Sequence, residues 1–379
     1  MSEEEVLEEK KPSWKRRADY KRPSRAFSKE WQPFPNNERH CVYQPGKPIG
    51  FDCDLVKIIG TEHYLKETGA PMVLEKHQCR ILNWMFTPRN FKLLYDTLGW
   101  SCIKKSGKTQ IAAAVADAWA RCYGGQIYSI ANDLKQAEGR AFDRVVDHLT
   151  VLRKVDPAKF EAIIDPYHHK QIAKDFTIRY NNDAVIQAIP CDPEGEAGGM
   201  QSLTIWDELW GYGDREKSWN MWTEMQPIPE GVGNITESIR LVVTYAGWHG
   251  KSELLWNLYE EVCKPDIEGV ERGVVVDSLI EAGDGHPLPV YIEGKSCVYW
   301  DHEPRMPWHT AEFLEGRKKD PALKSRTSEY ARIWENRWTS GLDPFIDIKM
   351  WDELCHRGMA MGLTNHLEDV HAPELAKTA

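Results

Sequence analysis

The sequence lacks the segments that direct a chain into or across a membrane. Its 379 residues contain no apolar run as long as the roughly 18 residues that a membrane-spanning helix needs. The N-terminus, MSEEEVLEEKK, also lacks the apolar stretch of a signal peptide. We therefore expect a globular protein of the cytosol that has no membrane partner.

Closely spaced cysteines are missing as well. None of the nine cysteines forms a CxxC pair, and the chain is too long to need disulfide staples. We expect nine reduced thiols. The alternative left open is a structural zinc site assembled from Cys and His residues that are distant in the sequence.

An excess of positive charge is also absent. The net charge is −10, so the overall field does not attract nucleic acid and any DNA contact must be local. A segregated basic run follows the glutamates of the N-terminus, which is typical of a disordered, solvated arm; an arm that docks on a partner or touches DNA is the alternative. The run consists of Lys10, Lys11, Lys15, Arg16, Arg17, Lys21, Arg22 and Arg25.

Composition and patterning divide the chain into four parts. Residues 1–45 are polar, charged and proline-containing, which predicts a tail or linker. Residues 46–265 form the expected core, and residues 266–345 a small lid or linker subdomain with a strand at 272–280 and a hairpin at 290–301. Residues 346–379 form a C-terminal stub.

Within the core, short β-rich runs alternate with helical runs. We expect strands at 97–103, 126–132, 202–208 and 239–246, a hairpin in 176–191, and helices at 108–123, 134–152 and 252–262. This alternation predicts an α/β fold with a mostly parallel central sheet flanked by helices. Ligands of such sheets bind at the carboxyl ends of the strands.

What is present at the first strand end is WSCIKKSGKTQ, a phosphate-binding (Walker A) pattern. Backbone N–H groups between a strand and a helix converge on a phosphate, while Lys108 reaches the phosphate oxygens and the Thr109 hydroxyl binds Mg²⁺. Cys102 stands where such loops usually open with glycine. A small residue is tolerated there if its φ is negative, whereas Gly107, beside the phosphates, is harder to replace.

Two later strands end in polar residues. In LTIWDEL, Asp207 can hold Mg²⁺ and Glu208 can polarise the attacking water, as in a Walker B strand. In VVTYAGWHGKSELLW, Thr244 can sense the terminal phosphate. Upstream of the loop, Gln78 in LEKHQCRIL has a side-chain amide that can pair with adenine. The set predicts a P-loop NTPase that uses ATP and Mg²⁺.

Four segments together resemble the ATPase part of the large terminase subunit of tailed bacteriophages. They are LEKHQCRILNWMF, WSCIKKSGKTQIAAAVADAWA with YSIANDLKQAEGRAF, GGMQSLTIWDELWGY, and VVTYAGWHGKSELLW. SEYARIWENRWTSGLDPFIDIKMWDEL resembles the stretch that leads from that part to the nuclease, so the likeness runs from about residue 70 to 355.

The resemblance implies roles for these residues and partners for the chain. It implies that Glu208 is the catalytic carboxylate, Thr244 the coupling residue, Gln78 the adenine contact, and that Thr109 and Asp207 hold Mg²⁺. The ATP-binding set it implies is Gln78, Lys104, Lys105, Ser106, Gly107, Lys108 and Thr109, with Lys104 as the second basic residue of the loop. The implied activity is ATP-driven translocation of double-stranded viral DNA by a homo-oligomeric ring on the procapsid, in the host cytoplasm, with the portal protein and the terminase small subunit as partners.

Two departures from the family pattern shape the expectations. The segment after Trp351 is too short for an RNase H-like nuclease core, so we expect no nuclease activity from this chain. No arginine precedes the acidic strand in CDPEGEAGGMQ, so the arginine that a ring motor needs at the neighbouring site is open among Arg140, Arg144 and Arg240. The alternatives are another P-loop translocase or helicase-type ATPase, and a non-hydrolysing assembly protein.

Overall fold

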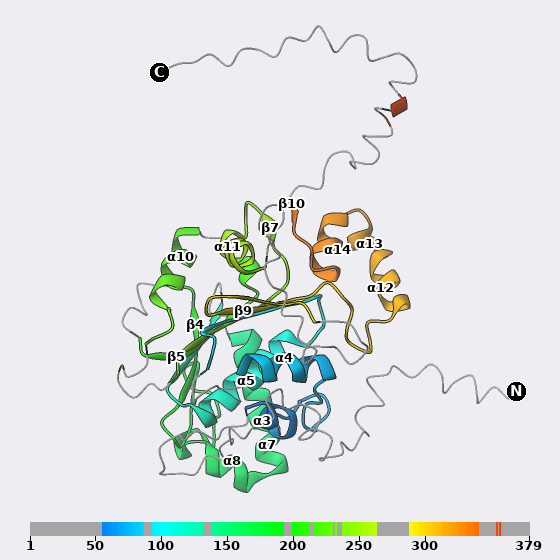
Figure 1. Cartoon of the computed structure of the whole chain (residues 1–379). Helices are drawn as coiled ribbons and strands as arrows, with labels where there is room; N and C mark the ends of the chain where they lie inside the picture. Colours follow the sequence, from blue (N-terminus) through cyan, green and yellow to red (C-terminus); the bar gives the residue numbers. More distant parts are fainter. Residues whose placement is uncertain are drawn as a thin grey trace, which may run out of the picture.

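The computed structural model describes residues 55–86, 93–131, 138–192, 199–212, 215–229, 232, 237–263, 288–340, 354 and 356–357. The predicted tail at 1–45, the predicted strand at 272–280 and nearly all of the predicted stub at 346–379 lie outside these ranges. Figure 1 shows one central sheet with helices above and below it. This arrangement is the α/β architecture that the alternating pattern predicts.

The central sheet has eight strands in the order β3-β4-β2-β5-β6-β1-β9-β8. All pairings among its six inner strands are parallel, whereas the edge strands β3 and β8 pair antiparallel with β4 and β9. The strands are β1 (Thr97–Ser101), β2 (Gln126–Ala131), β3 (Thr177–Arg179), β4 (Val185–Pro190), β5 (Gln201–Asp207), β6 (Ile239–Thr244), β8 (Val290–Glu293) and β9 (Ser296–Trp300). A separate parallel pair joins β7 (Trp248–His249) to β10 (Thr339–Ser340).

Helices cover both faces of the sheet. One face carries α3 (Leu55–Glu62), α4 (Lys76–Phe86), α5 (Lys108–Cys122), α7 (Asp143–Val155) and α8 (Pro157–Ile163); the other carries α10 (Arg215–Glu224) and α11 (Glu253–Val262). Short turns of helix are η2 (Glu138–Phe142), η3 (Pro166–His168) and η4 (Leu209–Gly211). The helices α12 (Ala311–Lys318), α13 (Pro321–Lys324) and α14 (Thr327–Trp334) form a group at one end of the sheet.

Helix α5 is enclosed by the rest of the core. Its sequence, KTQIAAAVADAWARC, is rich in alanine, the strongest helix former, and its alanines leave room for close packing. Almost all of its residues are buried, and it contacts the strands β5 and β6 on one side and the helices α3 and α7 on the other. The phosphate-loop helix is therefore fixed rigidly against the strands that carry the acidic pair and Thr244.

The strands of the core lie where the apolar runs predict them, and the structure differs from the expected elements in two places. The expected helix at 134–152 is described only from Glu138, where it begins as a π-helical turn that is interrupted at Arg140 (φ −120°, ψ −115°) before α7. The hairpin expected in the 266–345 subdomain instead extends the central sheet, because β9 pairs in parallel with β1 over Thr97–Ser101.

The described cysteines correct one expectation. Cys79, Cys102, Cys191, Cys263 and Cys297 are free and buried, as predicted for reduced thiols. Cys122 is disulfide-bonded, so the expectation of nine reduced thiols is wrong at that position. No helix within the described ranges is long and apolar enough to cross a membrane.

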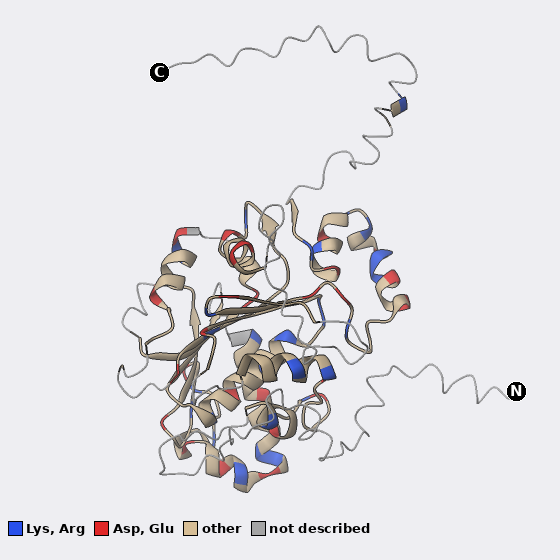
Figure 2. Ribbon diagram, in the orientation of Figure 1, with Lys and Arg blue, Asp and Glu red and all other residues tan. Residues whose placement is uncertain are grey.

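Charged residues of both signs share the outer helices. Figure 2 shows blue and red segments on the same helices, α12 to α14 among them. Helix α12 illustrates the pattern, with Glu312 in its first turn and Arg317 and Lys318 in its last. This mixture agrees with the net charge of −10, which leaves the sequence as a whole without an excess of positive charge.

Candidate functional site

The phosphate-binding pattern forms a loop between β1 and α5. Gly107 caps the helix with φ +81°, a left-handed conformation that favours glycine, and Lys105 precedes it with φ +67°. Cys102 is not among the residues with positive φ, so it meets the condition for replacing glycine at the start of the loop. The Lys108 ammonium donates to the carbonyl oxygens of Cys102 (2.8 Å) and Ile103 (3.1 Å) and so lies inside the loop.

Three strand ends bring the predicted site residues together. β6 lies between β1 and β5 in the sheet, so the loop, Thr244 and the acidic pair meet at one edge. The Thr109 hydroxyl donates to Asp207 Oδ1 at 3.4 Å, which joins two segments 98 residues apart in the sequence. Asp207 is 1% exposed, and its Oδ2 has no hydrogen-bond partner among the described residues.

These donors fit a magnesium ion. Mg²⁺ prefers hard oxygen ligands and is usually bound by one or two carboxylates, a phosphate and water. Thr109 and Asp207 offer a hydroxyl and a carboxylate oxygen in contact with each other, and no residue in the described part of the chain bonds to the second oxygen of Asp207 and would compete. A buried carboxylate oxygen without a partner is costly, which is the expected signature of a ligand position.

Burial governs the electrostatics of the acidic pair. Burial, followed by the adjacent Glu208, raises the pKa of Asp207 to about 7, although Arg140 and Lys108 act in the opposite direction. Burial also raises the pKa of Glu208 against the pull of Lys108. Two acids and two cations thus share a poorly hydrated site, where electrostatic interactions are stronger than in water.

Glu208 has an unusual backbone conformation. It follows β5 with φ +59° and ψ +51°, the left-handed region, and begins the short turn η4. Its N–H donates to the Val243 carbonyl (2.8 Å), and its carboxylate Oε2 accepts a hydrogen bond from the Trp210 indole N–H (2.6 Å). Non-glycine residues in this region cost energy and cluster at functional sites.

Thr244 and Gln78 lie beside the loop. The buried Thr244 hydroxyl donates to the Tyr245 carbonyl (2.9 Å), and the Thr244 carbonyl accepts from the Cys102 N–H (3.4 Å). The Gln78 amide donates to the Ser106 carbonyl (3.2 Å) and accepts from the Glu75 N–H (2.9 Å). Gln78 therefore supports the loop directly, and its contact with adenine stays a prediction.

Segments that the sequence patterns did not indicate also contact the loop. The Trp308 indole donates to the Lys105 carbonyl (2.9 Å), and the Lys104 N–H donates to the Ile333 carbonyl in α14 (2.7 Å). The positive charge of the Arg332 guanidinium, in the same helix, acts to lower the pKa of Glu208, against the larger effect of burial. The abundance of tryptophan was the available signal, but the sequence does not show which tryptophans reach the site.

The three candidate arginines have different surroundings. Arg140 donates to the Asp207 carbonyl of its own chain (2.8 Å), so it belongs to this site. Arg144 forms ion pairs with Glu67 and Asp147 at the surface. Arg240 is 5% exposed, lies over the Trp222 ring at 3.5 Å and donates to backbone carbonyls, so it is part of the core and cannot reach a neighbouring subunit.

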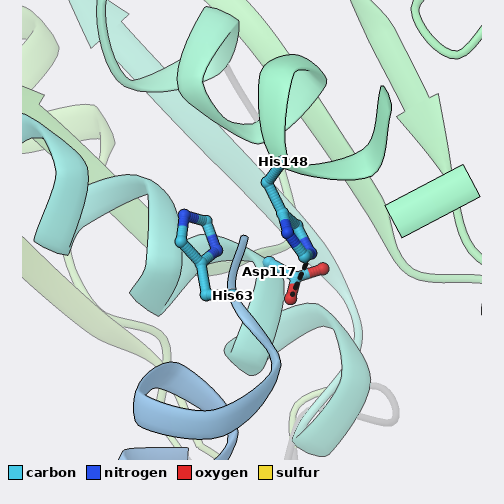
Figure 3. A group of neighbouring side chains, drawn as sticks. All are labelled: His63, Asp117 and His148. Atoms are coloured by element: carbon cyan, nitrogen blue, oxygen red, sulfur yellow. Dashed lines mark ion pairs between the residues drawn. The ribbon is translucent and has the colours of Figure 1, made fainter. Parts of the chain in front are cut away.

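A second polar cluster lies behind the phosphate-loop helix. Figure 3 shows His63, which follows α3, close to His148 on α7 and Asp117 on α5; the two imidazole rings stack with their centres 4.3 Å apart. All three side chains are fully buried, and within the described part of the chain they form the one group of three His, Cys, Asp or Glu side chains whose ligand atoms lie close enough together to hold a metal ion. They therefore represent the alternative of a zinc site formed by residues distant in sequence, with a carboxylate in place of cysteine.

Hydrogen bonding determines where the proton of His148 lies. The Tyr64 backbone N–H donates to His148 Nδ1 (2.8 Å), so the proton of the neutral ring is on Nε2, 3.4 Å from Asp117 Oδ2. That proton occupies the position from which His148 would bind a metal. Asp117 also accepts from the Tyr180 hydroxyl (2.9 Å) and from Arg121 (3.2 Å). The cluster is therefore a hydrogen-bond network that ties α3, α5 and α7 together.

Comparisons with known proteins give structural neighbours only. No family model matches the sequence, and no curated protein matches it. Among solved structures, the chain is similar to the large terminase ATPase domain of Thermus phage P74-26, with a TM-score of 0.42 and 15% identity, over 68% of this chain and 96% of that one. An arginine-to-alanine mutant of the same domain matches with the same score and identity and is covered to 97%. Both neighbours are large terminase ATPase domains, the family that the sequence resembles.

Proposed function

We propose that the chain binds and hydrolyses ATP at the carboxyl edge of its central sheet. The observation that carries this proposal is the contact between Thr109 and Asp207 at 3.4 Å, beside a buried carboxylate oxygen to which no described residue donates a hydrogen bond. An accidental Gly-Lys-Thr and an accidental Asp-Glu would have no reason to meet. Here they share one site with an ammonium group.

Each side chain has a role that its position supports. Lys108 neutralises the terminal phosphates, and the N–H groups of the loop from Lys105 to Gly107 cradle them. Thr109 and Asp207 hold Mg²⁺, which supplies charge neutralisation at the phosphates when it is bound. Glu208 accepts a proton from the attacking water. Thr244, at the end of β6 between β1 and β5, responds to loss of the terminal phosphate.

We further propose that hydrolysis drives double-stranded viral DNA into a procapsid. The four sequence segments that resemble the terminase family support this, since they contain all of the site residues. The mixed charges of the outer helices suit a transient grip on DNA phosphates without reading of bases. The partners are then the portal protein, the terminase small subunit and further copies of this chain in a ring, assembled transiently on the procapsid in the host cytoplasm.

The test measures ATP hydrolysis with and without DNA. We expect Mg²⁺-dependent hydrolysis that blunt duplex DNA stimulates more than single strands do. Lys108→Ala should lose about a hundredfold of the rate, because it removes the phosphate-binding cation. Lys154→Ala, at an exposed position of α7, is the matched control and should behave as wild type.

Two results would point elsewhere. A preference for single strands would favour a helicase-type motor over a packaging motor. If the folded protein binds a shell or a portal but does not turn over ATP, it is an assembly protein and the proposal is wrong.

A further inference from the structure

The Glu208 carboxylate is held by a hydrogen bond from a neighbouring side chain. The Trp210 indole N–H donates to Glu208 Oε2 at 2.6 Å, two residues along the turn η4. A donor to a charged oxygen gives a short and comparatively strong bond with a defined direction. The left-handed backbone conformation of Glu208 fixes the direction in which its side chain leaves the main chain, and the hydrogen bond from the indole fixes the position of the carboxylate.

Trp210 is itself held by an arginine from α14. The Arg332 guanidinium lies 4.0 Å from the centre of the Trp210 ring, and it also lies against the rings of Tyr245 (5.0 Å) and Trp248 (4.6 Å). Arg332 is 2% exposed and forms an ion pair with Glu329 at 2.8 Å. Cation–π contacts gain strength when the cation is shielded from water in this way.

The end of α14 is fixed to the strand ends that carry the site. The Asn336 side chain accepts hydrogen bonds from the Ser101 hydroxyl (3.1 Å) and the Ala246 N–H (2.6 Å), and it donates to the Asp301 carbonyl (3.0 Å). Ile333 accepts from the N–H of Lys104 in the phosphate loop (2.7 Å). The arginine therefore comes from a helix whose position is tied to both the loop and the sheet.

We propose that Trp210 and Arg332 are positioning residues, which orient the Glu208 carboxylate for its reaction and connect it to α14. Arg332 fixes the plane of the indole ring, and the indole N–H fixes the carboxylate. The inference rests on the proposed ATPase function. It adds two residues to the set of site residues that the sequence patterns predict, and it makes α14 part of the catalytic apparatus. General-base efficiency depends on the distance and direction to the proton that is removed, so small displacements of Glu208 lower the rate.

The test separates the N–H group of Trp210 from its ring. Trp210→Phe keeps an aromatic ring against Arg332 but removes the donor, and we expect kcat for ATP to fall about tenfold or more. KM for ATP should stay close to wild type, because the loop is not changed. Trp210 packs against the core as Trp222 does, so the melting temperature should fall no more than it does in Trp222→Phe, which shortens the ring in the same way. Trp222→Phe is the matched control, since the Trp222 ring covers another buried arginine, Arg240, at 3.5 Å; it should keep the wild-type kcat.

Arg332 variants give a second arm. Arg332→Met should lower kcat, and Arg332→Lys should restore part of it, because lysine keeps the cation over the rings but loses the planar fork that pairs with Glu329. If Arg332→Met does not fold, the comparison of Trp210→Phe with Trp222→Phe still decides the matter.

The outcomes distinguish the two proposals. Absence of ATP hydrolysis by the wild-type protein would contradict the proposed function. Hydrolysis by the wild type together with an unchanged kcat for Trp210→Phe would overturn only the positioning role. A lower kcat would also overturn it if the melting temperature of Trp210→Phe fell clearly below that of Trp222→Phe, or if KM rose by the same factor by which kcat fell.

Discussion

Replacing Asp207 with asparagine should stabilise the metal-free protein while it abolishes activity. The change keeps the size and shape of the side chain but removes its charge. Asp207 is 1% exposed, and none of the residues that the structure describes donates a hydrogen bond to its Oδ2. A buried carboxylate without full pairing costs folding energy, so the neutral amide removes a penalty that the wild type tolerates for function.

The size of the effect follows from the shift in the Asp207 pKa. Burial raises this pKa from 3.8 to about 7. Each unit corresponds to about 1.4 kcal/mol, so the penalty at pH 8 is at most about 4 kcal/mol, and we expect about 2–4 kcal/mol after relaxation of the neighbours. Because the folded state binds the proton more tightly, the wild type loses stability as pH rises between these two values. The advantage of Asp207→Asn is therefore larger at pH 8 than at pH 5, by about 2 kcal/mol.

Denaturant titrations at pH 5 and pH 8, with a chelator and without nucleotide, measure both effects. Adding Mg²⁺ and ATP should stabilise the wild type by mass action and leave the variant nearly unchanged, while ATP turnover by the variant falls about a hundredfold. A variant that is less stable than wild type at pH 8, or that shows the same difference at both pH values, would refute the view that the buried Asp207 carboxylate destabilises the metal-free protein.

Three further predictions concern other residues. Asp117→Asn should lower the free energy of unfolding by about 1–3 kcal/mol, because the buried Arg121 keeps its ion pair with Glu62 but loses the one with Asp117; no measurable loss in a denaturant titration would contradict the network. Gly107→Ala should cost about 1–2 kcal/mol of backbone strain at φ +81° and weaken nucleotide binding in calorimetry, although the added Cβ would meet its nearest atom only at 3.9 Å; wild-type affinity would count against the loop geometry. Burial lowers the pKa of His309 from 6.5 to about 4, so the protein should lose about 1–3 kcal/mol of stability as pH falls between these values, and His309→Asn should lose less; identical pH profiles for the two proteins would argue otherwise.

The strands and the helix of the loop were predictable because their signals are local. The run from Thr97 to Ser101, the alanine-rich helix after Gly107 and the apolar strand before Asp207 each carry a period or composition typical of one structure. The order of polar residues at strand ends then placed Lys108, Thr109 and the acids at one edge, because parallel strands end on the same side.

What the sequence did not reveal depends on contacts between distant segments. Asn336 bonds to Ser101 across 235 residues, and no local pattern marks that asparagine. The pairing of β9 with β1 likewise joins a hairpin to the sheet through backbone hydrogen bonds, which side-chain patterns do not encode. Arg332 looked like an ordinary helical arginine, since only the folded chain brings the rings of Trp210 and Tyr245 around it.

We propose that Glu208 activates water at a site where ATP is bound, and Glu208→Gln tests this role most directly. The amide keeps the shape of the side chain but cannot accept the proton. We predict that ATP still binds with an affinity close to wild type in a binding titration, while single-turnover hydrolysis slows about a hundredfold or more. Hydrolysis at the wild-type rate by Glu208→Gln would contradict the account.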